Sequence, residues 1–271
     1  MNAIITLPSG LEAVEVGGVY RVLAKLPPDV HKRTAIPRFA APMVDPKDWI
    51  EIDRQSDFGD NYILDQKSHG SCTGFASAGA LMRARTLEGM PPVRLSGAYT
   101  YAWINGGRDD GAIISDTLTS LQQHGTCPEA ECPWDCIYRS QIPTSADRSA
   151  ARFRILEAYR VDRFDELVSG LQLGFIGVGA VQVGGSFADL DADGIAGFDR
   201  GPGNHAVCFD GVRRLASGEW VVDLPNSWGL EFGRHGRCYV TRRHVESVEQ
   251  DCYLIRAATS DPQDLPPPTR S

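Results

Sequence analysis

The stretch from Cys72 to about Leu87 constrains the fold more than any other part of the sequence. Small or apolar side chains occur at nearly every turn of the helix that it predicts, and Gly89 and Pro91 end that helix. A helix that is apolar on all sides has to be covered on all sides. We therefore expect this helix to lie inside the protein.

The other predicted elements change in type along the chain. Helices are predicted at Ser115–His124, with Gly125 after it, and at Arg163–Leu171, closed by Gly170 and Gly174. Short β-branched or aromatic runs predict strands at 175–183, 206–212, 220–224, 237–241 and 253–257. Because helices come early and strands late, the expected fold class is α+β with segregated lobes.

The chain divides into three parts by composition. With 271 residues it is long enough for one large domain or two lobes around a shared core. Residues 1–45 read as a proline-containing extension, with a β-like run at 14–26 that Gly17 and Gly18 interrupt. Residues 46–259 form the predicted main domain, and 260–271 a proline-rich tail.

The charge balance excludes some classes of partner. Lys and Arg number 27 against 35 Asp and Glu, a net charge of −8, whereas nucleic acid or an anionic membrane surface requires a basic face. The longest apolar stretch, 175–183, is far shorter than the about 20 residues of a membrane-spanning helix. No basic-then-apolar leader is present, so we expect a soluble protein that is cytoplasmic or exported by another route.

The seven cysteines are expected to be free thiols. An odd number cannot pair completely, and without a leader the default is a reducing compartment. Cys127, Cys132 and Cys136 lie close together, but their spacing is not that of common zinc sites. Cys238 and Cys252 could pair in an oxidising setting. We predict no metal and no cofactor.

An acidic stretch has the opening of a calcium-binding loop. Asp189, Asp191 and Asp193 alternate with other residues, and Gly194 follows them. Arg200 stands where such a loop carries a bidentate glutamate, and its charge would repel the ion. A solvated acidic loop is the better interpretation, with calcium binding as the alternative.

Three separate segments together contain the groups of a nucleophilic site. Each alone has an ordinary structural interpretation, as a core thiol, a structural histidine or a turn. Together they offer Cys72 as a thiolate at a helix N-terminus, with His205 as acid and base. Asn226 would orient the imidazole and Trp228 would shield that hydrogen bond, while Gln66 and the Cys72 backbone N–H would form an oxyanion hole.

These segments resemble the papain-like cysteine peptidases, particularly their bacterial branch. Q-x5-C, N-H-A-V and N-S-W-G occur in that family's order and spacing, and the resemblance covers roughly residues 45–257. It implies a papain-like two-lobe fold with the active site in the cleft between a helical lobe, about 66–160, and a β-barrel-like lobe, about 161–259.

The resemblance also implies residues that contact the substrate. The pair Gly111 and Ala112 would bind its backbone, Asn204 would offer a backbone group near the scissile bond, and Val178 and Ala180 would line an apolar pocket. It implies a peptide or protein as the partner.

The sequence departs from that family at several positions. His69 replaces a disulfide cysteine, Thr73 replaces the tryptophan after the nucleophile, and Ala112 replaces the second glycine of the pair. A long helical propeptide is not evident. The extended, proline-rich residues 1–45 suggest instead a short segment that blocks the cleft.

The leading hypothesis is a cysteine protease, a thiol hydrolase that cleaves peptide bonds through an acyl-enzyme. One alternative uses the same site for acyl transfer, or for deamidation of a partner's glutamine. Another is a catalytically silent binding module that kept the fold. Cleavage fragments would separate hydrolysis from deamidation, and a separated Cys72 and His205 would favour the silent module.

Overall fold

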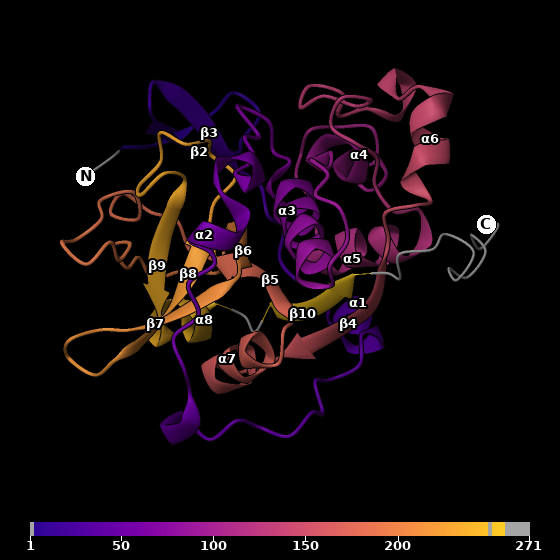
Figure 1. The fold of residues 1–271 in the computed structure, drawn as a ribbon. Coiled ribbons are helices and arrows are strands. Elements are labelled where there is room, and N and C mark those ends of the chain that lie inside the picture. Colours follow the sequence, from indigo (N-terminus) through magenta and orange to yellow (C-terminus); the bar gives the residue numbers. More distant parts are fainter. Residues whose placement is uncertain (1–2, 249–250, 258–271) are drawn as a thin grey trace.

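A long buried helix lies at the centre of the molecule. The computed structural model describes residues 3–248 and 251–257, and in it α3 spans Cys72–Leu87, as the sequence predicts. Residues 72–85 of this helix are buried. Gly74 allows close packing against α4 (Gly97–Ala102), since a Cβ at Gly74 would lie 2.3 Å from the carbonyl oxygen of Gly97. Figure 1 shows α3 between α4 and the strands.

The other helices are shorter than α3. The two other predicted helices are confirmed as α5 and α7, each shifted by one residue at its start. The helices are α1 (Val30–Ala35), α2 (Gln55–Phe58), α5 (Ile114–Gln123), α6 (Thr144–Ala150), α7 (Phe164–Gln172) and α8 (Arg242–Ser247), with 3-10 turns at Pro46–Asp48, Asp60–Tyr62 and Arg139–Gln141. Among the described residues, none of the helices has the length and apolar character needed to cross a membrane.

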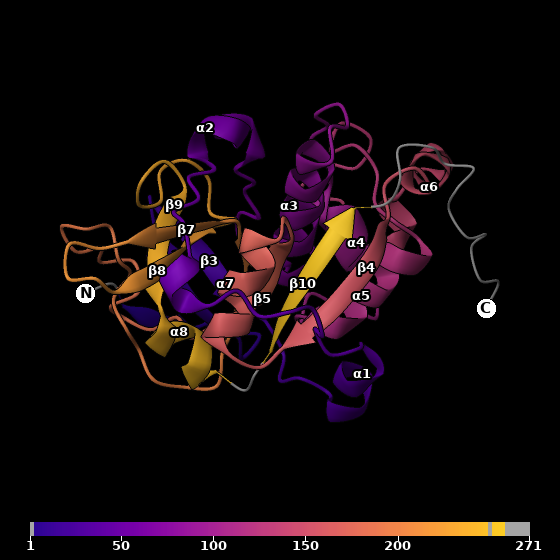
Figure 2. The same ribbon diagram turned by 60° about the horizontal axis from the view of Figure 1, so that its bottom comes forward.

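A four-stranded antiparallel sheet packs directly against α3. Its order is β4 (Ile155–Val161), β10 (Cys252–Ala257), β5 (Ile176–Val181) and β6 (His205–Phe209). Helix α3 contacts β5, β6 and β10, while α7 contacts β5 and β10, and Figure 2 shows the sheet with these helices. Along β6, Ala206 and Cys208 belong to the cluster around α3, whereas Val207 and Phe209 belong to the other cluster. The strand period of two thus divides the core into two layers.

The other late strands form a separate three-stranded sheet. It contains β7 (Gly211–Arg214), β8 (Trp220–Pro225) and β9 (Arg237–Thr241) in that order. The α+β class is confirmed, but the described strands after β3 make two open sheets rather than a closed barrel. The predicted single strand 206–212 is divided at Asp210, whose buried carboxylate pairs with Arg83 and Arg237, so that β6 and β7 join different sheets.

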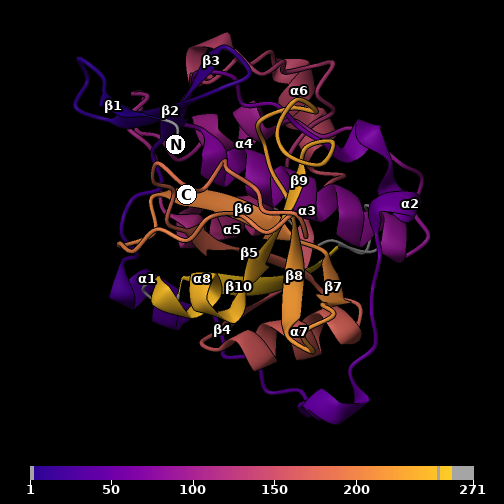
Figure 3. The ribbon, with the colours of Figure 1, turned by 90° about the vertical axis from the view of Figure 1, so that its left-hand side faces the viewer.

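The N-terminal residues form a third sheet. Strands β1 (Ile4–Thr6), β2 (Glu12–Val16) and β3 (Val19–Leu23) are antiparallel, and Gly17 and Gly18 make the β2–β3 turn with φ of 61° and 74°. Ala13 and Val14 are fully buried, so the sheet is attached to the core. Figure 3 shows β1–β3 at the top of the view and α1 lower down, at its left edge. The predicted tail 260–271 lies outside the described residues.

Candidate active site

Cys72 is the first residue of α3 and is completely buried. No side chain caps this helix, so its free backbone N–H groups lie near the thiol. Burial raises the pKa of the Cys72 thiol, and backbone hydrogen bonds from Ala206, Ala24 and Thr73 oppose that increase. Because Ala206 directly follows His205, the structure brings the predicted nucleophile and base to one place.

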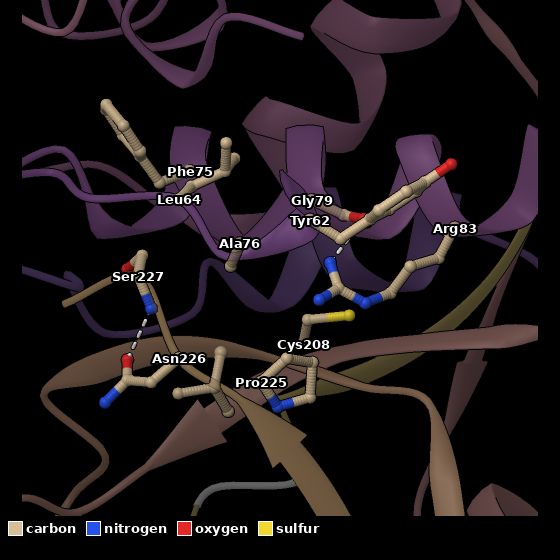
Figure 4. Close-up of a pocket in the computed structure, with 11 residues that line it drawn as sticks. Tyr62, Leu64, Phe75, Ala76, Gly79, Arg83, Cys208, Pro225, Asn226 and Ser227 are labelled. Atoms are coloured by element: carbon tan, nitrogen blue, oxygen red, sulfur yellow. Dashed lines mark hydrogen bonds between the residues drawn. The ribbon is translucent and has the colours of Figure 1, made fainter. Parts of the chain in front are cut away.

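His205, the first residue of β6, has its ring fixed by Asn226. Its Nε2 lies 2.9 Å from Asn226 Oδ1. The same oxygen accepts the backbone N–H of Ser227 at 2.8 Å, and Figure 4 shows this second hydrogen bond. An oxygen at this position accepts, so Nε2 of His205 donates. Nδ1 of the neutral ring then carries a lone pair, and it has no hydrogen-bond partner within 3–248 and 251–257. This is the tautomer that a general base requires.

Trp228 covers the histidine, as predicted from its position. Its side chain is fully buried, and its ring centroid lies 4.8 Å from that of His205. Burial lowers the pKa of His205 to about 4, and the hydrogen bond to Asn226 opposes this decrease. With both side chains buried, the site as it stands favours a neutral thiol and a neutral imidazole rather than an ion pair.

Gln66 is held on both sides of its amide. Its Oε1 accepts the Ser227 hydroxyl at 2.7 Å, and its Nε2 donates to His69 O at 2.9 Å and to Val22 O at 3.3 Å. The oxygen of Val22 therefore occupies one of the N–H directions that the predicted oxyanion hole would use.

The carbonyl of Val22 belongs to a segment that passes through the site. Residues 21–26, which we call the N-terminal segment, comprise the end of β3 and the three residues after it. Ala112 N–H donates to Ala24 O at 3.1 Å, and Leu26 N–H donates to Ala112 O at 2.9 Å. On the other side, Lys25 N–H donates to Asn204 O at 3.0 Å. The predicted contact residues Ala112 and Asn204 thus bind this segment through their backbones.

Gly111 is needed for this close approach. A Cβ at Gly111 would lie 1.9 Å from Ala24 O, and the residue has a φ of 92°. The backbone of Ala112, where the family pattern has glycine, still pairs with the N-terminal segment. Of the predicted pocket residues, Ala180 donates its N–H to Asp251 O at 2.9 Å, while Val178 pairs with Tyr253 and Cys208 in the sheet.

Two further charged contacts fix the N-terminal segment, and sequence reasoning missed both. Lys25 Nζ lies 2.7 Å from Asp251 Oδ2, with side-chain exposures of 2% and 0%. The Arg21 guanidinium pairs with Asp65 and donates to Trp228 O at 2.8 Å. The partners lie far apart in the sequence and belong to no motif, so only the folded structure identifies them.

The residues that differ from the family pattern make ordinary structural contacts. His69 Nδ1 lies 3.0 Å from Asp109 Oδ2 on the surface side of the site, and Thr73 is buried. All seven cysteines are free thiols, Cys238 and Cys252 included. Cys132 is near Cys127, and its Sγ donates to Cys136 O at 3.6 Å.

The acidic loop binds its own backbone. Asp191 Oδ1 accepts the N–H groups of Asp193 and Ile195, each at 2.9 Å, which is the arrangement of a turn. Within the described part of the chain, no group of three or more His, Cys, Asp or Glu side chains is arranged to hold a metal ion.

The depressed pKa of His205 predicts a pH dependence of stability. A histidine with an ordinary pKa near 6.5 when unfolded and about 4 when folded opposes folding once the pH falls below 6.5. Above pH 6.5 the histidine is neutral and does not oppose folding. At pH 4.5 the penalty is about 2–3 kcal/mol, by the value of 1.36 kcal/mol for each pKa unit.

Urea unfolding at pH 7 and pH 4.5 tests this for the wild-type chain and a His205→Gln variant. We expect the variant to lose less stability between the two pH values than the wild type does. His244, which is also buried with a lowered pKa, is present in both proteins and cancels in the comparison. Equal losses in the two proteins would contradict the expected role of His205.

Comparisons with known proteins concern the fold. No protein-family model and no curated protein sequence matches the chain. Among solved structures, it is similar to xylellain, a cysteine protease from Xylella fastidiosa, with 24% identity, a TM-score of 0.59, and coverage of 87% of this chain and 91% of that one. Procathepsin B S9 from Trypanosoma congolense gives 16% identity, a TM-score of 0.66 and 88% coverage of both chains.

A plant structure extends the same comparison. Bromelain from Ananas comosus, in complex with the inhibitor E64, has 18% identity and a TM-score of 0.61, covering 76% of this chain and 98% of that one. These identities are low, so the similarity concerns the arrangement of the elements. This chain has the papain-like fold of those cysteine proteases.

Proposed function

We propose that the chain is a cysteine protease that hydrolyses peptide bonds through an acyl-enzyme. The main support is the pairing of His205 Nε2 with Asn226 Oδ1 at 2.9 Å, beneath Trp228 and beside the thiol of Cys72. This pairing leaves Nδ1 free to accept the thiol proton. The fold shared with cysteine proteases supports the same chemistry.

The reaction follows from these groups. Nδ1 of His205 accepts the proton of Cys72, and the thiolate attacks the peptide carbonyl to form a tetrahedral oxyanion. Gln66 Nε2 and the Cys72 N–H stabilise that charge. The imidazolium then donates its proton to the leaving amine, which gives a thioester. Water, deprotonated by His205, hydrolyses the thioester and regenerates the thiol.

We also propose that the N-terminal segment keeps this site closed. It takes up the backbone groups of Ala112 and Asn204, one N–H of Gln66 and the space above Gly111. A substrate would need the same groups, so activity requires this segment to move. This deepens the sequence-based hypothesis of a blocking segment within residues 1–45 and limits the contact to residues 21–26.

The proposed hydrolysis is tested in the 271-residue chain with a Lys25→Ala substitution, which weakens the closed state. We expect it to cut an unfolded protein substrate into fragments. Adding Cys72→Ala should reduce the rate by at least about 10³-fold, because no other group supplies the nucleophile. Cys136→Ala, at a half-exposed thiol outside the site, is the matched control and should leave cleavage unchanged.

Mass spectrometry of the substrate gives the deciding result. Fragments that depend on Cys72 support a protease. An intact substrate with shifts of about one dalton at glutamines would instead support deamidation. An unmodified substrate, together with unreactive Cys72 in the Lys25→Ala chain, would favour the silent module.

A further inference from the structure

Three cysteines outside the candidate active site lie in contact with one another. Cys127 and Cys132 are completely buried and belong to the apolar cluster around α3, while Cys136 is half-buried and packs against that cluster. The side chains of Cys127 and Cys132 are hydrogen-bonded to each other, and the side chain of Cys136 contacts Cys132. All three are free thiols, and the hydrolysis proposed above uses none of them.

The backbone holds Cys127 and Cys132 at the two ends of a closed loop. Ser96, the N-cap of α4, donates its backbone N–H to Cys127 O at 2.9 Å and its hydroxyl to Cys132 O at 2.6 Å. Within the loop, Cys132 N–H donates to Glu129 O at 3.2 Å. One residue therefore binds the backbone at both ends of the loop. Cysteines whose side chains already touch need little backbone movement to form a disulfide.

The same contacts give the three thiols different roles. The hydrogen bond between Cys127 and Cys132 lowers the pKa of Cys132 and raises the pKa of Cys127. A thiolate, and not a thiol, attacks a disulfide, so Cys132 is the stronger nucleophile of the buried pair. Partial burial raises the pKa of Cys136 to about 11, but Cys136 is the member of the group that solvent reaches.

We propose that these cysteines are a site of thiol–disulfide exchange, in which Cys136 reacts with a low-molecular-weight disulfide and a disulfide then forms between Cys127 and Cys132. The thiolate of Cys136 attacks the small disulfide, which forms a mixed disulfide and releases one small thiol. Cys132 attacks Cys136 Sγ and releases the second small thiol. Cys127 then attacks Cys132 Sγ, which returns Cys136 to a thiol. The buried pair loses two electrons and two protons, which the small disulfide gains as it becomes two thiols.

The new bond would fix a surface beside the candidate active site. Residues 128–130, which lie between the two buried cysteines in the chain, line a surface cavity together with Asp65 and Lys67. These two residues flank Gln66, whose amide is the expected oxyanion donor. The exchange itself requires only the three thiols, so it does not depend on whether the chain is a protease.

Oxidised glutathione is the probe that tests the site. It is added at pH 8 to the 271-residue chain carrying Cys72→Ala, in which the proposed proteolysis plays no part. Free thiols are then blocked with N-ethylmaleimide in acidic urea, and the chain is digested without reduction. Cuts at the acidic residues between the three cysteines separate them, so the masses of linked peptides identify the bond. We expect the Cys127–Cys132 bond, with Cys136 free at the end of the reaction, and its loss on addition of dithiothreitol.

Two comparisons make the test specific. Cys208 and Cys238 are as buried as the pair, but the contacts that affect their pKa values are with charged groups rather than with a thiol, so both should stay reduced. Cys136→Ser removes the half-exposed thiol and should slow formation of the buried bond at least about 10-fold, because the oxidant then has to reach a buried sulfur. Thermal unfolding confirms that this variant is folded.

Three results would overturn the inference. The first is glutathione retained on Cys136 while Cys127 and Cys132 are both blocked as free thiols. The second is a bond between Cys132 and Cys136 as the end product. The third is an equal rate of bond formation in the presence and absence of Cys136, which would contradict its role as the thiol that meets the oxidant.

Discussion

The Lys25→Glu variant is expected to react with iodoacetamide at Cys72 at least about 100-fold faster than the wild-type chain at pH 7. In the wild type the thiol is fully buried under the N-terminal segment, and its pKa is raised by that burial. The substitution places a second carboxylate against Asp251. Breaking a buried ion pair costs about 3–5 kcal/mol, enough to shift a closed–open equilibrium by two or more powers of ten.

Peptide mass analysis of all seven cysteines measures this rate for each thiol separately. Lys32→Glu is the matched control, because Lys32 belongs to the same N-terminal part of the chain but pairs with Asp116 at a half-exposed site. An exposed pair contributes little, so this variant should label like the wild type. The double variant Lys25→Glu with Asp251→Lys restores a pair of opposite sign and should return Cys72 to slow labelling.

Point substitutions are preferable to removal of the first residues in this experiment. Val14 and Leu23 belong to the same buried cluster as Trp228, which covers His205. Deletion of the N-terminal sheet would therefore open the core as well as the site. If Cys72 were equally slow in the wild type and in Lys25→Glu, the ion pair would not control access, and the proposed closure by residues 21–26 would be wrong.

The sequence was informative where the signal is local. The buried helix α3 was predicted with both ends, because its composition, its small residues and the glycine after it act within a few turns of chain. The same holds for β9, and for α5 and α7 within one residue at each end. His205 and Asn226 are hydrogen-bonded to each other as their motifs suggested.

The missed features depend on contacts between distant residues. Nothing near Lys25 or Asp251 indicates that a lysine and an aspartate would be buried together, and charged side chains are rarely buried unless they are paired. Likewise, the run 206–212 reads as one strand, but Asp210 in its middle pairs with Arg83 on a helix, and β6 and β7 join different sheets. Such pairings are fixed by the folded arrangement, so patterns within one segment cannot reveal them.

The buried charges around Asp210 connect α3 to both sheets. Arg83 Nε donates to Asp210 Oδ2 at 2.7 Å, and Arg237 pairs with Asp210 and, at 2.9 Å, with Asp223. The side chains of these four residues are 0–6% exposed. Figure 4 shows the Arg83 side chain beside Cys208 of β6, in the pocket where Asn226 and Ser227 follow β8. The helix that begins with Cys72 is thus joined to the strands that carry His205 and Asn226.

Asp210→Ala is expected to lower the free energy of unfolding by about 3–5 kcal/mol. It leaves two buried guanidinium groups in a space where Asp223 is the remaining carboxylate, and an unpaired buried charge is strongly destabilising. Burial and the charge of Asp210 raise the pKa of Asp223 to about 6, and Arg237 opposes this increase. Asp223 supplies one negative charge against two guanidinium groups, so it cannot replace the lost one.

Urea unfolding at pH 7 measures this loss, with Asp165→Ala as the control. Asp165 pairs with Arg242 at 2.6 Å on the surface, with side-chain exposures of 29% and 45%, so its removal should cost less than about 1 kcal/mol. A loss at Asp210 as small as the loss at Asp165 would mean that the buried charges do not hold α3 against the sheets. The position of Cys72 relative to His205 would then depend on apolar packing alone.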